Sequence, residues 1–421
     1  MAVDLRQVMA AFLTFSMFAM LGNMIKRDHI DPLWEPEPET TMVQYGMLKN
    51  SKPGMHKLSE ANYGPWKEHD EIVKPCSKKP LFKGKEQSNG YIFFSLTHGP
   101  EYHASQVANA VAVARYLGAT LVLPDVRGAK LGDKRNFKEL YDVEKFTKTL
   151  TGVVRVEKTP PKEISKERLP IIKVPYMVSE EYVASNIKPI FKNETRNLKI
   201  VTYFNNNSSP YDKIINRESD YQCLAMYESL KPQKELQELI DSMVGTLRSM
   251  SKKTNGRFVS VDLRAEMFTE TSCKLLGSSG GHNKRWCYNG ERIGEFLKKI
   301  GFHEDTTVYL TQTGWDTSLN ALRDVFPNTF TKDAIMPADE KAKFTDAESR
   351  KTIDFYVCAQ GDVFVPAYPS RFYEAVVGER IGLGKTQIFI PAEKDSNSDS
   401  ATDYVSPYVA NRSHFAHSCF C

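Results

Sequence analysis

The sequence predicts an α/β fold in which two Rossmann-like domains face a cleft, behind an N-terminal membrane anchor. Three observations predict it. Short apolar runs typical of strands alternate with helix-like runs twice along the chain. An uncharged apolar run lies near the N-terminus. The composition, 41% hydrophobic and 26% charged over 421 residues, is that of a globular chain of two or three domains, and a net charge of +4 is too small to indicate a nucleic-acid partner.

The uncharged run is Val8–Ile25. At about 1.5 Å per residue it spans roughly 27 Å, just enough for the hydrocarbon core of a bilayer. We therefore expect residues 1–30 to form a cytosolic tip and a single membrane anchor. A cleaved signal peptide and a buried core helix are the alternatives. The flanking charges do not set the orientation, but no second spanning run follows, so an anchor with a lumenal body fits best.

Glycosylation signals and the number of cysteines also bear on whether the body of the protein lies in the lumen. Acceptor triplets for N-glycosylation begin at Asn193, Asn206, Asn207 and Asn411. About two would arise by chance in such a chain, so this signal alone is weak. The seven cysteines fit an oxidising lumen, and their odd number leaves at least one thiol free or paired between chains.

Residues 31–88 are expected to form a stem, because seven prolines and many charges leave little apolar periodicity. The N-terminal Rossmann-like domain then covers residues 89–252. Its opening strand Gly90–Leu96, helix Ala104–Leu117 and strand Ala119–Pro124 read as a βαβ unit, which implies a parallel sheet. Residues 155–175 are proline-rich and read as an exposed excursion. A helix with one apolar face, 233–252, ends the domain.

The C-terminal Rossmann-like domain covers residues 253–392 and is expected to bind the donor. Strands and helices alternate again here. The expected strands are 257–263, Thr307–Leu310, Asp362–Pro366 and Thr386–Pro391, and the expected helices are Glu291–Ile300, Thr317–Phe326, Ala347–Gln360 and Ser370–Val377. Residues 393–421 form a polar tail.

Ligands of open α/β sheets sit beyond the carboxyl ends of the strands, and two loops there stand out. The first, 97–103, holds His98, Gly99, Glu101 and His103, and its glycine would let backbone amides approach a phosphate or a sugar. The second is Asp262–Glu266. Its Arg264 would meet either an anion such as a diphosphate or a carboxylate of the protein, Asp262 or Glu266, and the two interpretations are equally open.

Three further patterns are weaker. The loop around 278–285 is basic and flexible, either a lid over an anionic donor or a solvated loop, and a disulfide between Cys273 and Cys287 would close it. Gly384–Thr386 resembles the end of a phosphate-binding loop, but Glu379 stands where that motif needs glycine. His417, Cys419 and Cys421 lack a second ligand pair for zinc, so no metal site is expected.

With these residues in view, the chain resembles the plant O-fucosyltransferase-like glycosyltransferases, and within them the mannan synthesis-related proteins. Three segments carry the resemblance: 89–124, Asp262–Met267, and 353–366 with Gly378-Glu379-Arg380 following. The resemblance implies a GT-B fold, a GDP-sugar donor (GDP-fucose or GDP-mannose), no required metal, and a type II protein of the Golgi membrane. The implied role is in mannan and glucomannan synthesis of the plant cell wall, with a glycan or polysaccharide as the acceptor.

By this match Arg264 would hold the β-phosphate and stabilise the leaving diphosphate, and Asp354 would recognise the guanine edge. Ser370, Arg371 and Phe372 would flank the diphosphate at a helix N-terminus, and His98, Gly99 and Asp262 would also lie on the donor side.

The sequence departs from the family at three places. Asp262 replaces a histidine, Pro100-Glu101-Tyr102 replaces an amide-containing turn, and Pro369-Ser370-Arg371 replaces Asp-Gly-Asn. Glu101, Glu266 and Asp262 remain candidates for a general base. These departures keep two alternatives open: a non-catalytic partner that assists a mannan synthase, and a lumenal lectin-like module.

Overall fold

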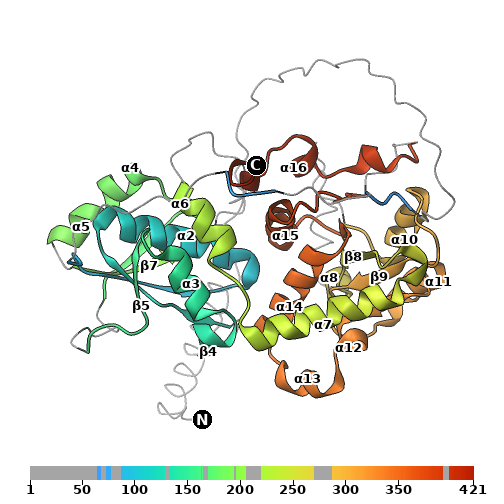
Figure 1. The fold of residues 1–421 in the computed structure, drawn as a ribbon, viewed down its shortest axis with the longest axis horizontal. Helices are drawn as coiled ribbons and strands as arrows, with labels where there is room; N and C mark the ends of the chain where they lie inside the picture. Colours follow the sequence, from blue (N-terminus) through green and yellow to red (C-terminus); the bar gives the residue numbers. More distant parts are fainter. Residues whose placement is uncertain are drawn as a thin grey trace, which may run out of the picture. The chain divides into compact units, whose positions relative to one another are not determined.

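The computed structural model describes residues 64–67, 73–76, 87–128, 132–162, 164, 169–193, 196–204, 220–269, 287–391 and 398–421. All of them belong to one compact unit, Leu58–Cys421. Within these ranges no helix is both long and apolar enough to cross a bilayer, and the expected anchor at Val8–Ile25 lies outside them. The protein is a mixed α/β fold built on two sheets that are parallel but for one pair of strands (Figure 1).

The first sheet centres on β1 (Tyr91–Leu96), which pairs in parallel with β2 (Thr120–Val122), β3 (Asp125–Arg127) and β7 (Asn197–Thr202). The expected βαβ unit is confirmed, with α2 as its helix. The remaining strands are the edge strands β4 (Lys134–Asn136), β5 (Arg155–Glu157) and β6 (Ile171–Val174). The interpretation of 155–175 as an excursion therefore missed β5 and β6, whose short lengths and flanking prolines hide the strand pattern.

Helices of the first part pack beside this sheet. The longest, α2 (Pro100–Leu117), has Pro100 in its first turn and ends at Gly118 in the left-handed conformation. Short elements complete this part: η1 (Phe137–Glu139), α3 (Val143–Leu150), α4 (Glu180–Tyr182), η3 (Val183–Ile187), α5 (Lys188–Asn193), α6 (Asp220–Cys223) and η4 (Leu224–Glu228).

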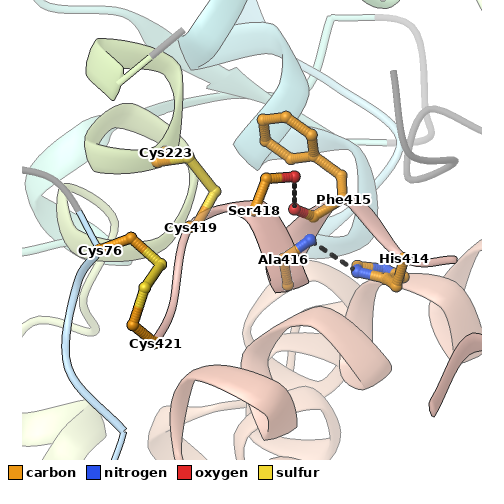
Figure 2. Close-up of a disulfide and its surroundings, with 8 residues drawn as sticks. All are labelled: Cys76, Cys223, His414, Phe415, Ala416, Ser418, Cys419 and Cys421. Carbon is orange, nitrogen blue, oxygen red and sulfur yellow. Dashed lines mark hydrogen bonds between the residues drawn. A yellow bond between two sulfur atoms is a disulfide. The ribbon is translucent and has the colours of Figure 1, made fainter. Parts of the chain in front are cut away.

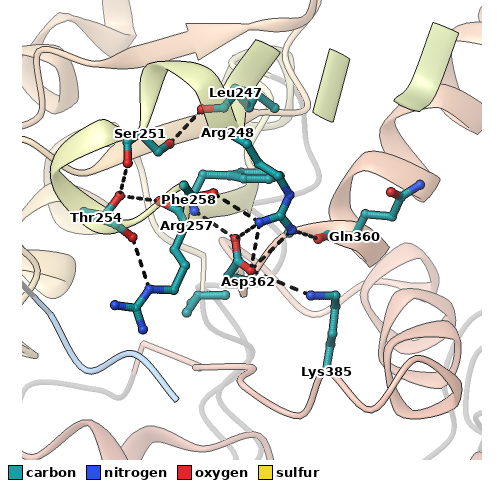
Figure 3. Close-up of polar contacts among 12 residues, drawn as sticks. Leu247, Arg248, Ser251, Thr254, Arg257, Phe258, Gln360, Asp362 and Lys385 are labelled. Atoms are coloured by element: carbon teal, nitrogen blue, oxygen red, sulfur yellow. Dashed lines mark hydrogen bonds and ion pairs between the residues drawn. The ribbon is translucent and has the colours of Figure 1, made fainter. Parts of the chain in front are cut away.

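The helix α7 (Lys234–Met250) leads to the second sheet and packs against α14 (Ala347–Gln360) (Figure 1). Its predicted apolar face is confirmed, since Leu236, Leu239, Ile240, Met243 and Leu247 are all buried. At its C-terminus Arg248 contacts Asp362, 3.3 Å from Nη1 to Oδ2, and the same carboxylate accepts from the Phe258 amide at 3.0 Å (Figure 3). Asp362 therefore ties α7 to two adjacent strands.

The second sheet has the order β10-β9-β8-β11, all parallel. Its strands are β8 (Phe258–Asp262), β9 (Thr307–Leu310), β10 (Thr329–Thr331) and β11 (Val363–Pro366). The sequence predicted all but β10. The expected strand Thr386–Pro391 is wrong: this segment forms only single bridges, Phe364 to Ile388 and Phe389 to Val405. Its backbone hydrogen bonds are divided between Phe364 and the C-terminal residues Tyr404 and Ser406, so neither pairing extends into a ladder.

The helices of this part include those expected from the sequence. The described helices of this part are η5 (Lys252–Thr254), α8 (Glu266–Thr269), α10 (Gly290–Lys299), η6 (Thr317–Leu319), α11 (Asn320–Val325), α12 (Lys332–Ile335), α13 (Ala338–Lys343), α14 and α15 (Arg371–Gly382). One apolar core extends from β1 and α2 to α14 and α15 and reaches Phe258 and Phe364 of the second sheet. A second core, with Val259 and Val261, covers the opposite face of that sheet.

The C-terminal segment 398–421 packs on both parts of the molecule. It contains η7 (Ala401–Tyr404), α16 (Pro407–Ala410) and η8 (Phe415–Ser418). Cys419 is bonded to Cys223 of α6, and Cys421 to Cys76 (Figure 2). Both cysteines considered for zinc are thus in disulfides, and among the described residues there is no acidic, histidine or cysteine cluster suited to a metal ion.

The remaining cysteines and the acceptor asparagines lie partly within the described residues. Cys358, buried in α14, is free, which accounts for the odd cysteine count. Cys287 is disulfide-bonded, while Cys273 lies outside the described residues. Asn411 is exposed at the end of α16. Asn206 and Asn207 lie outside the described residues, and Asn193 ends α5.

Candidate active site

The carboxyl edge of the second sheet gathers the charged and hydroxyl residues of interest. In the order β10-β9-β8-β11 the chain moves outward from β8 to β9 and β10, then returns to the other side of β8 with β11. Such a reversal is where open α/β sheets bind ligands. Asp262 is the last residue of β8 and Arg264 follows it, Thr311 follows β9, and Tyr368 and Ser370 follow β11.

Arg264 is the cation at this edge. Its Nη2 donates a hydrogen bond to the Tyr368 hydroxyl and lies 3.8 Å from Asp262 Oδ1. Its Nε is buried without a hydrogen-bond partner among the described residues, although 26% of the side chain is exposed. Burial alone would lower the pKa of Arg264, but the Asp262 carboxylate together with Tyr368 and Asp354 outweighs burial and keeps the pKa above its ordinary value. The guanidinium is thus permanently charged and has an unused donor.

Asp262 is fully buried beneath Arg264. Its Oδ1 accepts from Thr311 Oγ1 at 3.0 Å and its Oδ2 accepts from Ser370 Oγ at 3.3 Å. Burial raises the pKa of Asp262, and Arg264 opposes that rise. The two interpretations of Arg264 from the sequence are therefore not exclusive: it faces an internal carboxylate and still has a donor to spare.

The N-terminus of α15 borders the same edge. Ser370 caps the helix by accepting from the Tyr373 amide at 3.0 Å, so its hydroxyl joins the helix to Asp262. Arg371 pairs with Glu374, 2.9 Å from Nη1 to Oε2. Phe372 is buried, with its ring edge-on to Phe355. Ser370 is thus placed at the edge, while the Phe372 ring belongs to the core.

Asp354 on α14 is buried behind this edge and has two internal partners. Lys332 Nζ lies 2.5 Å from Oδ2, and the Tyr309 hydroxyl donates to Oδ1 at 2.7 Å. Burial raises the pKa of Asp354, while Lys332 opposes the rise. We expected the Asp354 carboxylate to recognise the guanine edge, and both of its oxygens therefore already have a partner within the protein. Each oxygen retains further acceptor capacity.

The first candidate loop begins α2. Gly99 caps the helix with φ +101°, and His98 has φ +69°. Glu101 is buried in the first turn and forms an ion pair with Lys351 of α14. His98 contacts Thr97, 2.8 Å from Nδ1 to Oγ1. His103 points into the core, with Nδ1 2.6 Å from the Tyr141 hydroxyl.

The structure brings some candidates together and separates others. Arg264, Asp262 and Ser370 form one cluster, and the Arg264 charge also acts on Glu101 and Asp354. Glu266 is exposed at the start of α8. Sequence reasoning missed Tyr368, Lys332 and Lys351. Lys351 precedes Asp354 by one helical turn, which could have drawn attention to it, whereas Lys332 gives no sequence signal for an ion pair.

Comparison with known proteins places the chain in a family. Residues 91–382 match the family model "GDP-fucose protein O-fucosyltransferase". The chain is 45% identical to Protein MANNAN SYNTHESIS-RELATED 1 of Arabidopsis thaliana and 44% identical to Protein MANNAN SYNTHESIS-RELATED of Trigonella foenum-graecum, in each case over 100% of both chains.

Among solved structures, a crystal structure of POFUT1 in complex with GDP is 16% identical with a TM-score of 0.47, over 72% of this chain and 99% of that one. The extent of the family match and the identity to the curated relatives decide the assignment. The chain belongs to the GDP-fucose protein O-fucosyltransferase family.

Proposed function

We propose that this protein is a glycosyltransferase that takes its sugar from a GDP-sugar, GDP-fucose or GDP-mannose, and acts in mannan or glucomannan biosynthesis. The observation that supports it most is Arg264, a charged side chain with an unused, buried Nε donor at the switch point of a parallel sheet. The relatives named for mannan synthesis support the pathway. The proposal includes a GT-B arrangement, with the two sheets in separate Rossmann-like domains that face a cleft.

In this proposal Arg264 binds the β-phosphate and stabilises the negative charge that develops as GDP leaves. Tyr368 and Asp262 hold the guanidinium in place, so little reorganisation is needed during the reaction. Ser370, Arg371 and Phe372 place the N-terminal end of α15, with its partial positive charge, near the diphosphate. His98 and Gly99 line the donor side, and Asp354 contributes its remaining acceptor capacity to the guanine.

The proposed reaction uses no metal ion, because Arg264 and the α15 terminus supply the positive charge. Removal of divalent cations with a chelator is therefore expected to leave the affinity for GDP unchanged. A calorimetric titration with and without chelator measures this. A loss of affinity of about 10-fold or more, restored by Mg²⁺ or Mn²⁺, would show that a metal neutralises the diphosphate instead.

The location in the proposal is the Golgi membrane, in type II orientation with the body in the lumen. The two described disulfides fit an oxidising compartment. Protease protection of a tagged chain in isolated Golgi vesicles tests the orientation. Digestion of a C-terminal tag without detergent would contradict it.

The central experiment is titration of the purified full-length chain with GDP, GDP-fucose and GDP-mannose. We expect binding that Arg264→Ala weakens at least about 100-fold, since a charge-assisted contact to phosphate is lost. Arg323→Ala, which removes an exposed arginine stacked on Trp315, is the matched control and should bind like wild type. Unchanged GDP affinity in Arg264→Ala would remove the proposed donor site.

A second candidate is a non-catalytic partner that assists a mannan synthase. The observation in its favour is the two buried acids, Asp262 and Glu101, that both interact electrostatically with Arg264 and disfavour a dianionic ligand. Co-expression with a mannan synthase separates the candidates. A gain in mannan that survives Arg264→Ala supports the partner function, and a gain that requires Arg264 supports the transferase.

A further inference from the structure

An ion pair joins the helix of the first βαβ unit to a helix of the second sheet at the edge of the proposed donor site. Lys351 of α14 contacts Glu101 Oε1 in the first turn of α2 and donates to the His98 carbonyl oxygen at 3.4 Å. Glu101 is only 5% exposed at its side chain, against 29% for Lys351. One ammonium therefore holds both a buried carboxylate and the backbone of the loop that precedes α2.

The loop is shaped around this ammonium. Gly99 has φ +101°, which side chains other than glycine rarely adopt. A Cβ at this position would lie 2.7 Å from Glu101 Oε2, 2.9 Å from Lys351 Nζ and 3.0 Å from Lys351 Cδ. Two independent features, the backbone conformation and the missing side chain, thus fit the close approach of Lys351.

The charge of Glu101 matters for Arg264. Burial raises the pKa of Glu101, Lys351 opposes that rise, and the Arg264 charge acts on the same carboxylate. A buried carboxylate without its counter-ion is costly, and its field would compete with a diphosphate for Arg264. Lys351 supplies that counter-ion from a different part of the fold. The Lys351 charge thus compensates the charge of Glu101, the acid in the turn that replaces the family's amide-containing turn.

We propose that Lys351 is a positioning residue for the donor site: it neutralises Glu101 and fixes the His98–Gly99 turn, leaving Arg264 free for the diphosphate. This role rests on the proposed function. It assigns Glu101 to a structural ion pair, so a general base for the acceptor has to be sought elsewhere.

The test compares GDP affinity in four variants of the full chain. Lys351→Met removes the Lys351 counter-ion from Glu101, and we expect GDP to bind about 10-fold or more weakly, since one buried ionic interaction is lost. Lys351→Arg keeps the charge and should stay within about 3-fold of wild type. In Glu101→Gln/Lys351→Met both charges are gone, and affinity should return to within about 3-fold of wild type.

A double variant that binds as weakly as Lys351→Met would show that the Glu101 charge is not what Lys351 compensates, and that result would overturn the proposal. Glu101→Gln alone keeps the test decisive if Lys351→Met does not fold. It leaves Lys351 without the Glu101 carboxylate at the edge of the proposed donor site, so GDP should bind about 3-fold or more tightly. Unchanged or weaker binding in Glu101→Gln would count against the proposal.

The outcomes separate this inference from the function on which it rests. If wild type binds no GDP at all, the proposed function fails and this role fails with it. If wild type binds GDP, Arg264→Ala abolishes binding, and Lys351→Met binds normally, only the role of Lys351 is overturned.

Discussion

At the scale of single residues, three cations near the proposed donor site each face a buried carboxylate. Arg264 lies beside Asp262, Lys332 beside Asp354, and Lys351 beside Glu101. Removing one member of such a pair is more costly than removing both, because an unpaired buried charge remains. Binding of an anion therefore depends on how far the carboxylate of each pair neutralises its cation. Of these three cations, Arg264 has a buried Nε without a hydrogen-bond partner within the described part of the chain.

Substitution of Gly99 should affect the protein in two ways, through the strained backbone and through the side chains that a Cβ would meet. Gly99→Ala is expected to lower stability by about 1–3 kcal/mol for the backbone strain alone and to weaken GDP binding in addition. Gly301 is the matched control, because its φ is +99° and a Cβ there would meet nothing within 4 Å. Gly301→Ala should show the strain without the loss of affinity. Equal GDP affinities in the two variants would contradict the contact argument.

His414 should make stability depend on pH. Full burial lowers the pKa of His414 to about 3, from 6.5 in the unfolded chain. The unfolded state then binds more protons between these values, so stability from the neutral ring is present above pH 6.5 and lost as pH falls. Wild type should lose about 2 kcal/mol from this group between pH 7 and pH 5, a loss absent in His414→Gln. Urea unfolding of both proteins measures it, and parallel pH profiles would refute it.

The site residues that could be predicted are those whose place in the sequence puts them at the end of a strand. The exit of a parallel strand identifies Arg264 and Asp262 as cleft candidates, because strand ends share one edge. The partners Lys332 and Tyr368 could not be predicted, since they approach from other elements and depend on packing. The spacing of Lys351 from Asp354 draws attention to Lys351 but gives no sign of its pairing with Glu101. Asp354 illustrates the limit: a match of motif gives its position, but only the fold shows Lys332 and Tyr309 at its oxygens.

At the scale of elements, helix starts and strand ends build the site together. The helices α2 and α15 both begin beside it, and Ser370 links the α15 cap to Asp262 at the end of β8. The long periodic helices and buried strands were predictable, because their apolar patterns are strong. Four of the three-residue strands, β3, β4, β5 and β10, were not, since such short strands carry too little pattern.

The α15 cap gives a prediction at this scale. Ser370→Ala should destabilise the protein by about 1–2 kcal/mol through the lost cap, and should weaken GDP binding because Asp262 loses a hydrogen bond. Ser179→Ala removes a comparable cap, the Ser179 hydroxyl that accepts from the Tyr182 amide at α4. It should cost stability alone. Thermal unfolding and GDP titration of both variants decide, and normal GDP binding in Ser370→Ala would disprove the link.

At the scale of the whole molecule, the C-terminal segment joins the parts covalently. Cys419 reaches back to Cys223 and Cys421 to Cys76, closing sequence separations of 196 and 345 residues. Trp66 also packs edge-on against Phe302. The domain boundaries drawn from composition treated these stretches as stem and tail, because long-range disulfides cannot be deduced from sequence spacing. A truncated chain that begins at Ser88 would lack both Cys76 and Trp66.

The disulfides should contribute measurably to stability. Loss of the Cys223–Cys419 bond in Cys223→Ser/Cys419→Ser is expected to lower the free energy of unfolding by about 2–5 kcal/mol, since a long loop is no longer closed. The free thiol variant Cys358→Ala is the control and should cost about 1–2 kcal/mol through the small space it leaves. Denaturant unfolding under oxidising conditions measures both, and an equal loss would contradict the stapling role.

The central claim is that a GDP-sugar binds at Arg264, and titration of the full-length chain with GDP tests it most directly. The account predicts binding to wild type and to Arg323→Ala, and a loss of at least about 100-fold in Arg264→Ala with the fold intact by thermal unfolding. Absence of GDP binding to wild type, or equal affinity in Arg264→Ala, would contradict the account and leave the synthase-assisting partner as the function to pursue.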